Sequence, residues 1–326
     1  MKGVTKVGLV LGGGGITGAA YEIATLMAVQ LATGWNPDEA EVVVGTSSGA
    51  FVSALVRHEA LTLDSLVHPG DDREDVAARI RGHIYQRDGV QSVAKWLRHG
   101  LSPGIRRPGL TLFMGSPAPY HSMGLADWVA SQVGQEAAMG WPTKDTAIVA
   151  YDIEARVRTA FGTDGAPDAG LAQAVAASTA IPLLFRPVPI NDRLYVDGGV
   201  ASGTHADLVL GHGSELDLVL IVAPMAATSQ RKRARAYEKM FDRVGRRSLE
   251  EEKRLIRNSW PNCDIITLTP SPSVQNVMRP NPMDASKAVP TFMRTLISMK
   301  RKLAQPDVWT ALSHHLDHHS DRAAVG

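Results

Sequence analysis

Two kinds of apolar segment alternate along the first part of the chain. Residues 6–11 (KVGLVL) form a short apolar run that stops at glycines, as a buried strand does. Residues 16–32 are rich in Ala, Leu and Met with apolar positions at helical spacing, and Gly34 is placed to end that helix. Residues 41–44 (EVVV) predict a second strand, which a further helix follows after residue 49. A strand–helix–strand order predicts that the two strands are parallel.

The pattern changes between residues 57 and 145, where charged residues, prolines and glycines predict a mostly helical insertion or lid. Residues 146–162 alternate like a hairpin. The remaining pattern predicts a small-residue helix at 168–180, strands at 193–197, 216–222 and 264–268, a long charged helix at 229–257 and a helix near 285–303. Strands that alternate with helices predict an α/β architecture.

Composition narrows the class of protein. A length of 326 residues suits one large α/β domain with insertions or two smaller domains. A hydrophobic content of 44% excludes a disordered chain. The balance of 34 Lys and Arg against 33 Asp and Glu argues against a nucleic-acid-binding protein. The single cysteine, Cys263, excludes an internal disulfide framework and a cysteine-rich zinc site.

The sequence predicts a cytoplasmic protein and leaves contact with a membrane surface open. No stretch reaches the roughly 18 apolar residues that cross a bilayer, and the first apolar run is too short for a signal peptide. However, residues 229–257 contain eleven Lys and Arg against five Asp and Glu, a net charge of +6. Such a helix could contact anionic lipid, or it could be a solvated helix with internal ion pairs.

A serine lies at the turn between the second strand and its helix. Gly45-Thr46-Ser47-Ser48-Gly49 matches G-x-S-x-G, and the strand before it and helix after it are the context that a nucleophile elbow needs. The helix N-terminus would stabilise negative charge near Ser47, and the backbone N–H of Ser48 could help to bind an oxyanion. The alternative is a chance match in a loop that contains Gly and Ser.

Residues 12–18 (GGGGITG) end the first strand and open the first helix, and they have two interpretations. Gly13, Gly15 and Gly18 fit the dinucleotide fingerprint, but the second strand does not end in the acidic residue that would hold a ribose. Alternatively, the backbone N–H groups of Gly13, Gly14 and Gly15 form an oxyanion hole. We favour the oxyanion hole because parallel neighbouring strands would bring this loop beside Ser47.

A third motif places Asp197 at a strand end before Gly198 and Gly199. Alone, such an aspartate is typical of a turn cap. The segment at 176–188 (AASTAIPLLFRPV) precedes it.

The chain resembles the patatin-like phospholipase family in the order and spacing of four motifs. These motifs are LGGGGITG, GTSSG, AASTAIPLLFRPV and YVDGG. The resemblance covers roughly residues 6–55 and 145–225. It implies a three-layer α/β/α fold with a central, mostly parallel sheet. We therefore expect one patatin-like domain over residues 1–326, with its core at 6–55 and 145–225, an insertion or lid at about 57–145, and a C-terminal helical and strand extension at about 226–326.

The resemblance also implies a chemistry. Ser47 would be the nucleophile and Asp197 its base in a Ser–Asp dyad that hydrolyses lipid esters, with no metal and no organic cofactor. Gly13, Gly14, Gly15 and Ser48 would supply the oxyanion hole. The remaining motif glycines would be Gly18, Gly45, Gly49, Gly198 and Gly199. The partner would be a lipid ester, while head group, acyl length, oligomeric state and the choice between hydrolase and acyltransferase stay open.

One position departs from the family pattern. The glycine loop of the family usually carries Arg or Lys just before its last glycine, and here that residue is Thr17. A catalytically weak or silent lipid-binding protein is therefore the alternative function.

Histidines and aromatic residues offer further candidates. His205 and His212 follow Asp197 and would give the order Ser–Asp–His of α/β-hydrolases, which is the main rival catalytic scheme. The C-terminal histidines, His314, His315, His318 and His319, are more typical of a solvated tail than of a metal site. Aromatic residues of the insertion could line an acyl pocket or a core: Trp96, Phe113, Tyr120 and Trp128.

Overall fold

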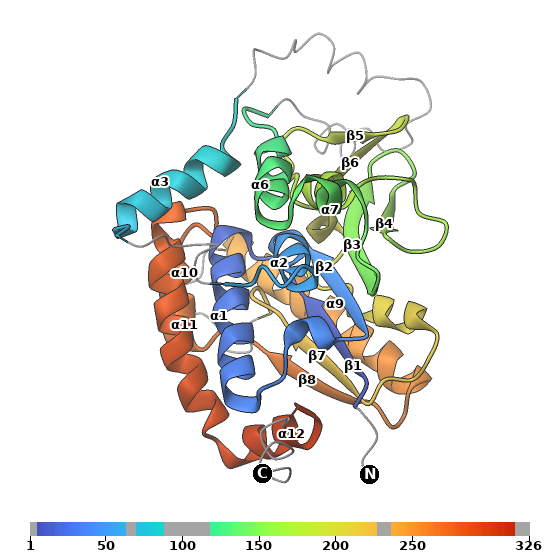
Figure 1. The fold of residues 1–326 in the computed structure, drawn as a ribbon, viewed down its shortest axis with the longest axis vertical. Helices are drawn as coiled ribbons and strands as arrows, with labels where there is room; N and C mark the ends of the chain where they lie inside the picture. Colours follow the sequence, from blue (N-terminus) through green and yellow to red (C-terminus); the bar gives the residue numbers. More distant parts are fainter. Residues whose placement is uncertain (1–4, 63–69, 88–117, 227–235, 317–326) are drawn as a thin grey trace.

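A computed structural model describes residues 5–62, 70–87, 118–226 and 236–316 (Figure 1). Its centre is an eight-stranded sheet. The strands are β1 (Val7–Leu11), β2 (Val42–Thr46), β3 (Asp145–Asp152), β4 (Val157–Phe161), β5 (Val188–Ile190), β6 (Arg193–Asp197), β7 (Leu218–Val222) and β8 (Asp264–Leu268). Their order is β5-β6-β3-β2-β1-β7-β8, and β4 also pairs with β3.

The sheet is parallel in its centre and antiparallel at one side. β1 pairs in parallel with β2 and β7, and the parallel part continues to β3 and β8. β4, β5 and β6 are antiparallel to their neighbours. The predicted parallel pairing of the first two strands and the predicted hairpin at 146–162 are confirmed. The central strands β1, β2 and β7 are buried along their whole length, which is why they read as continuous apolar runs.

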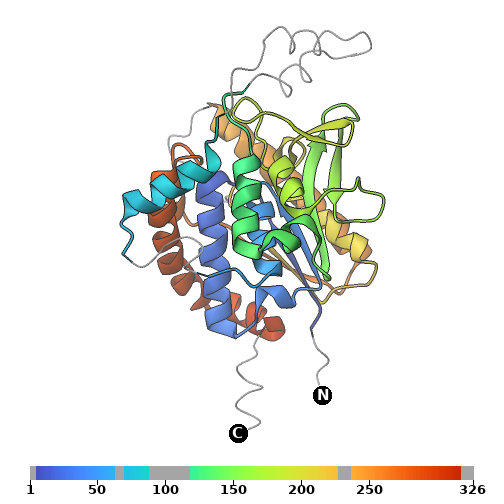
Figure 2. The same cartoon turned by 45° about the horizontal axis from the view of Figure 1, so that its top comes forward.

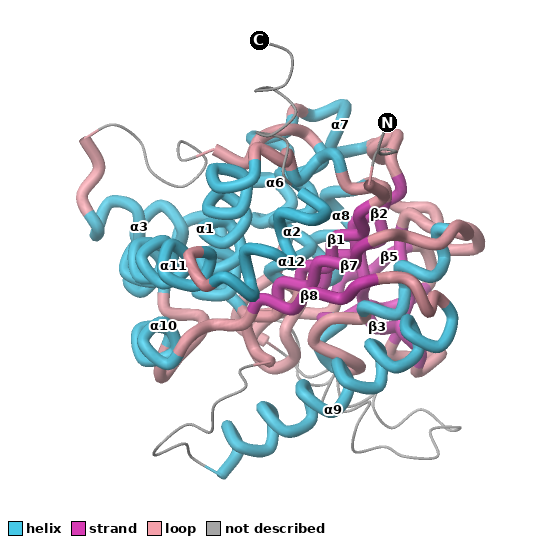
Figure 3. Tube along the Cα trace, turned by 90° about the horizontal axis from the view of Figure 1, so that it is seen from below, coloured by secondary structure: helices cyan, strands magenta, loops and turns pink. Residues whose placement is uncertain are grey.

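Helices cover both faces of the sheet, so the three-layer α/β/α fold is confirmed (Figure 3). One face carries α1 (Gly15–Thr33), α2 (Ser48–Arg57) and α8 (Leu171–Ser178), and the other carries α9 (Ala236–Ser259) with the 3-10 helix η4 (Ala206–His212). Successive residues of β1 point to opposite faces: Leu9 and Leu11 pack in the α1 layer, and Val10 packs in the α9 layer.

The insertion and the C-terminal part pack beside α1 and α2 (Figure 2). The described part of residues 57–145 contains α3 (Arg73–Ile84), α6 (Met123–Val133) and α7 (Gln135–Met139), joined by irregular segments, in line with the predicted helical insertion. The C-terminal part contains α10 (Pro272–Met278), the 3-10 helix η5 (Ala285–Lys287), α11 (Ala288–Leu303) and α12 (Pro306–Leu316). α11 runs along α1, and η5 packs against α3.

Helix α9 corresponds to the predicted charged helix at 229–257, of which residues 229–235 lie outside the described ranges. Its Ile256 is buried in the core layer behind the sheet. On its exposed side, Arg247 pairs with Glu251 at 3.1 Å and Lys253 pairs with Glu250 at 2.8 Å. These contacts are internal ion pairs of the helix, and contact of this helix with anionic lipid stays a prediction. Among the described residues, no helix is long and apolar enough to cross a bilayer.

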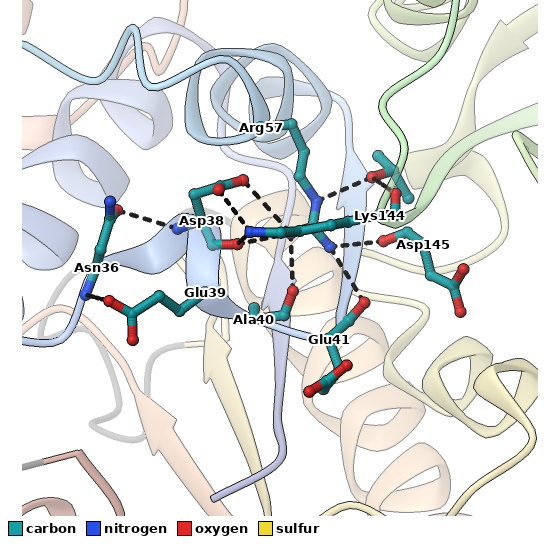
Figure 4. Close-up of polar contacts among 9 residues, drawn as sticks. Asn36, Asp38, Glu39, Ala40, Glu41, Arg57, Lys144 and Asp145 are labelled. Carbon is teal, nitrogen blue, oxygen red and sulfur yellow. Dashed lines mark hydrogen bonds and ion pairs between the residues drawn. The ribbon is translucent and has the colours of Figure 1, made fainter. Parts of the chain in front are cut away.

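Arg57, the last residue of α2, fastens this helix to the strands beside it (Figure 4). Its side chain is fully buried. The guanidinium donates hydrogen bonds to the Thr146 hydroxyl and to the carbonyls of Asp38, Ala40, Glu41 and Asp145 at 2.7–3.4 Å. The Asp38 carboxylate lies 3.6 Å from Arg57 and also binds Lys144 at 2.6 Å. Arg57 therefore provides hydrogen-bond donors for the backbone carbonyl groups of the segments that lead into β2 and β3.

The ends of β2 and β6 meet along β3. Residues 145–149 of β3 pair with β2 and residues 150–152 pair with β6, while residues 148–152 pair with β4. Because a strand has only two edges and β4 occupies one, β2 and β6 lie one after the other on the opposite edge. They run in opposite directions, so their C-terminal residues, Thr46 and Asp197, approach each other from the two sides.

Candidate active site

Ser47 lies on a sharp turn between β2 and α2. Its φ is +54° and its ψ is −119°, in a region that non-glycine residues rarely adopt. The two glycines that flank it allow the close packing behind this turn. A Cβ on Gly45 would lie 2.4 Å from the Ser53 Oγ, and a Cβ on Gly49 would lie 2.0 Å from the carbonyl oxygen of Leu11 in β1. The predicted elbow therefore has the strained geometry that exposes a serine at a helix N-terminus.

Asp197 accepts a hydrogen bond from Ser47. The Ser47 Oγ lies 2.7 Å from the Asp197 Oδ2, although 150 positions separate the two residues in the sequence. The other carboxylate oxygen, Oδ1, accepts the backbone N–H of Gly199 at 2.7 Å. A Cβ on Gly198 would lie 2.4 Å from the carbonyl oxygen of Val149, so this glycine lets the turn pass over β3. Burial raises the pKa of Asp197 to about 6, while the hydrogen bonds from Ser47 and Gly199 act in the opposite direction.

The segment at 176–182 holds the backbone of both residues of this pair. The Ser178 hydroxyl accepts the backbone N–H of Ser47 at 2.9 Å and donates to the Val149 carbonyl. The Ala180 carbonyl accepts the backbone N–H of Asp197 at 3.0 Å. The sequence analysis used this segment only for the family resemblance and missed the positions of Ser178 and Ala180 between the serine and the aspartate.

The glycine loop faces the serine elbow. A Cβ on Gly13 would lie 3.2 Å from the Ser47 Cβ. The backbone N–H of Gly13 donates to the Gly203 carbonyl at 2.8 Å, so this N–H is not free to bind an oxyanion. The expectation that Gly13 belongs to the oxyanion hole is therefore wrong for its backbone N–H. Gly14 is the N-cap of α1 and Gly15 is its first residue, while Ser48 is the first residue of α2.

The first N–H groups of a helix have no partner inside that helix. Within the described ranges, no hydrogen bond uses the backbone N–H of Gly14, Gly15 or Ser48. Gly15 also has a φ of +62°, which favours glycine. Among the described residues, these three amides therefore have no recorded hydrogen-bond acceptor, unlike the amide of Gly13.

A distant segment of the chain supports this loop. The Pro282 carbonyl accepts the backbone N–H of Thr17 at 3.1 Å. A Cβ on Gly15 would lie 2.9 Å from the Met283 Sδ, and the Tyr85 hydroxyl in turn donates to the Met283 carbonyl. Nothing in the sequence pattern near residues 282–283 indicated a role at the site.

An apolar cavity opens beside Ser47 and encloses about 660 Å³ of empty space, part of which is open to solvent. It lies between α1, α2, α3, α6 and the start of α11. Its apolar wall contains Ile16, Ala19, Ala20, Phe51, Ile80, Ile84, Leu125, Trp128, Ile181, Phe185, Met283 and Ala288. The hydroxyl groups on the wall are those of Ser47, Ser48, Ser122 and Thr179. Among the described residues, no charged side chain lines this cavity.

The aromatic residues of the insertion contribute unequally. Trp128 lines the cavity and packs against Phe51, with 4.8 Å between the centroids of the two rings. Tyr120 packs behind the wall against Tyr85 and Phe185. Trp96 and Phe113 lie outside the described ranges.

Thr17 does not face the cavity. Its side chain is fully buried, and it is absent from the cavity wall. Gly18, the next residue, allows the Ser48 hydroxyl to approach α1, because a Cβ on Gly18 would lie 2.9 Å from the Ser48 Oγ. Thr17 therefore lies in the interior of the α1 layer and contributes no atom to the cavity wall.

The described histidine candidates form hydrogen bonds with residues other than Ser47 and Asp197. The His205 Nδ1 forms a hydrogen bond with the Thr46 hydroxyl at 3.1 Å, and burial lowers the pKa of His205 to about 3. His212 pairs with Asp145, at the other end of β3. His315 pairs with Asp264. His318 and His319 lie outside the described ranges, and the described residues contain no cluster that could hold a metal ion.

Comparisons with known proteins give the family. Residues 9–210, more than half of the chain, match the family model of the patatin-like phospholipases. No curated protein matches the sequence.

Two similar solved structures are VipD from Legionella pneumophila and a chain of the ExoU–SpcU heterodimeric complex from the type III secretion system of Pseudomonas aeruginosa. Each is 14% identical, with TM-scores of 0.35 and 0.30. The matches cover 91% and 99% of this chain but only 67% and 59% of those chains. Since both TM-scores are low, the assignment rests on the sequence match alone: this chain belongs to the patatin-like phospholipase family.

Proposed function

We propose that the protein is a serine hydrolase of lipid acyl esters, in which Ser47 is the nucleophile and Asp197 is the general base. The observation that carries this proposal is the 2.7 Å hydrogen bond from the Ser47 hydroxyl to the Asp197 carboxylate at a strained elbow. A serine hydroxyl becomes nucleophilic when a neighbouring base accepts its proton. A buried aspartate with a pKa of about 6 is a stronger base than an exposed one and is still ionised at pH 7.

The reaction would proceed in two steps. Asp197 takes the Ser47 proton as Oγ attacks the ester carbonyl, and the N–H groups of Gly14, Gly15 and Ser48 stabilise the oxyanion. The protonated Asp197 then gives its proton to the leaving alcohol, which leaves an acyl group on Ser47. In the second step Asp197 takes a proton from water, the hydroxide attacks the acyl carbonyl, and the fatty acid is released with Ser47 reprotonated.

The cavity supports a fatty-acyl substrate. Its apolar wall suits an aliphatic chain, whose burial is favourable by about 0.8 kcal/mol for each CH₂ group. Because no charged side chain of the described residues lines the cavity, a phosphate group would gain no ion pair there. We therefore place one acyl chain inside the cavity and any polar head group at its mouth.

The test compares wild type with Ser47→Ala on a panel of fatty-acyl esters that includes phospholipids, lysophospholipids and acylglycerols. We expect wild-type turnover on part of the panel and a loss of at least about 10³-fold in Ser47→Ala. Ser131→Ala, a change on the surface of α6, is the matched control and should keep wild-type rates. Undiminished hydrolysis in Ser47→Ala would overturn the proposal, and liposome binding without any turnover by the wild type would favour a silent lipid-binding protein instead.

A further inference from the structure

A buried acidic residue of α9 has no role in the steps above. Helix α9 covers the face of the sheet opposite to α1 and α2 (Figure 3). Leu249, Glu252 and Ile256 follow one another at helical spacing and are all buried, so Glu252 lies on the side of α9 that faces the interior. The family match ends at residue 210 and does not include α9. An acidic residue in such a place calls for a physical explanation.

Three hydrogen bonds tie the Glu252 carboxyl group to the segment that follows the aspartate turn. Its Oε1 accepts the Ser202 hydroxyl, and its Oε2 accepts the Thr204 hydroxyl at 2.6 Å and the backbone N–H of Ala206 at 2.8 Å. The two oxygens of a carboxyl group can accept several hydrogen bonds at once. Glu252 therefore holds the 202–206 segment at three points.

The 202–206 segment contacts the glycine loop. The Gly203 carbonyl accepts the backbone N–H of Gly13 at 2.8 Å. A Cβ on Gly12 would lie 2.9 Å from the same carbonyl oxygen and 3.1 Å from the Thr204 Cγ2, so the two backbones pass each other closely. The position of the glycine loop therefore depends on where Gly203 and Thr204 lie.

The same segment contacts the other two motifs. The His205 ring forms its hydrogen bond with the hydroxyl of Thr46, the residue directly before Ser47. The backbone N–H of Ser202 donates to the carbonyl of Gly198 in the aspartate turn at 3.3 Å. His205 also has a φ of +53°, which a non-glycine residue keeps only where its surroundings hold it. One segment thus contacts the glycine loop, the serine elbow and the aspartate turn.

We propose that Glu252 is a positioning residue that sets the relative placement of the glycine loop, the serine elbow and the aspartate turn through the 202–206 segment. Its oxygens fix two side chains and one backbone N–H of this segment, which directs the Gly203 carbonyl at Gly13. Glu252 is not part of the cavity wall, so it acts on the reaction through these contacts alone. Misplacement of catalytic groups by about 1 Å can cost roughly 100-fold in rate. This inference rests on the proposed hydrolase function.

The experiment compares Glu252→Gln with Glu252→Met on a short, water-soluble ester. The amide of Glu252→Gln keeps an oxygen that accepts hydrogen bonds and gains an N–H that the Ser202 hydroxyl can accept, so its kcat should stay within about threefold of wild type. The thioether of Glu252→Met fills the space but is a weak acceptor. Its kcat should fall by about 10- to 100-fold with KM within about twofold, because misplaced groups act on the transition state. Glu251→Met, on the exposed side of α9, is the matched control and should keep wild-type kcat.

Thr204→Val tests one of the three hydrogen bonds from its other end, and it decides the question also where Glu252→Met fails to fold. Valine keeps the shape of the threonine but lacks the hydroxyl that Glu252 accepts. We expect kcat to fall by about three- to tenfold with KM within about twofold. Wild-type kcat in Thr204→Val would overturn the proposal. So would equal losses in the two Glu252 variants, or a loss of kcat that equals the fraction of unfolded protein under the conditions of the assay.

Hydrogen exchange separates failure of this inference from failure of the hydrolase proposal. If the wild type hydrolyses no ester, the hydrolase proposal fails, but the positioning role is still measurable without turnover. Peptides that cover residues 11–18 should exchange faster in Thr204→Val than in wild type, while peptides that cover α12 should not change. Unchanged exchange at residues 11–18 would overturn the positioning role, and so would equally faster exchange in α12, which would mark a general loss of stability.

Discussion

Asp197 is a carboxylate that the fold holds in a place where its charge is unfavourable. It is 5% exposed and has two hydrogen-bond donors, the Ser47 hydroxyl and the Gly199 N–H, but no cation is among the groups that shift its pKa. Desolvation outweighs those two hydrogen bonds, which is why its pKa rises to about 6. The same burial that makes Asp197 a better base therefore reduces the stability of the folded chain above that pH.

The pH dependence of hydrolysis should report this pKa directly. If ionised Asp197 is the base, kcat/KM should rise with pH through a midpoint of about 6 and level off above pH 7. A pH–rate profile on a neutral ester, which has no ionisable group of its own, measures this midpoint. A profile that stays flat down to pH 4.5 would contradict the assignment of Asp197 as the base.

Replacement of Asp197 by Asn should separate activity from stability. A carboxyl group whose pKa rises from 3.8 to about 6 on folding destabilises the folded state above pH 6, by about 3 kcal/mol for roughly two pKa units. Asp197→Asn should therefore lose hydrolysis and raise the free energy of unfolding at pH 8, with a smaller gain near pH 4, where the wild-type group is protonated. Urea unfolding at the two pH values measures this, and a decrease in stability at pH 8 would contradict it.

At the scale of the elements, the site depends on a junction that the sequence pattern predicts only in part. Each strand that carries a motif was predicted from the local sequence pattern, including the strand that ends at Asp197. The meeting of β2 and β6 depends on the extension of β3 beyond β2 and on the antiparallel direction of β6, which pairs with β3 at residues 150–152. Register and strand direction come from long-range pairing, so local periodicity does not contain them.

The elbow helix is held at both ends, and Arg57 holds the end remote from Ser47. Arg57→Leu would leave the carbonyls of Ala40 and Asp145 unsatisfied in the interior. We expect a loss of about 3–5 kcal/mol in the free energy of unfolding, measured by chemical denaturation. Arg57→Lys should recover only a minor part, because one ammonium group cannot reproduce the planar guanidinium.

The exposed Arg247 on α9 provides the control for this change. Its side chain is 81% exposed and pairs only with Glu251 in the described structure, so Arg247→Leu should change stability by less than about 1 kcal/mol. Equal effects of Arg57→Leu and Arg247→Leu would contradict the account of Arg57.

At the scale of the whole molecule, the cavity is lined by segments that lie far apart in the sequence. The family match ends at residue 210, yet Met283 and Ala288 line the cavity, and Pro282 holds the glycine loop. The sequence analysis predicted the three-layer fold and the helix that begins near this segment, but not its contact with the site. That contact depends on how α11 packs along α1, a tertiary interaction that no local motif encodes.

Met283 offers a test of this contribution from the C-terminal part. Met283→Trp should reduce the space beside Gly15 and lower kcat/KM for a twelve-carbon acyl ester by roughly tenfold more than for a two-carbon ester. Met293, on the same part of the chain, is 51% exposed on α11, so Met293→Trp is the matched control and should leave the ratio unchanged. An unchanged ratio in Met283→Trp would show that the acyl chain does not pass this residue.

The central claim is that Ser47 is a nucleophile activated by Asp197, and covalent labelling tests it most directly. The protein is treated with a fluorophosphonate, and the adduct is located by peptide mass spectrometry. The account predicts one adduct on Ser47 in the wild type, none in Ser47→Ala, and labelling of Asp197→Asn that is slower by at least about 100-fold although this variant is folded. Labelling at another residue, or wild-type labelling of Ser47 in Asp197→Asn, would contradict it.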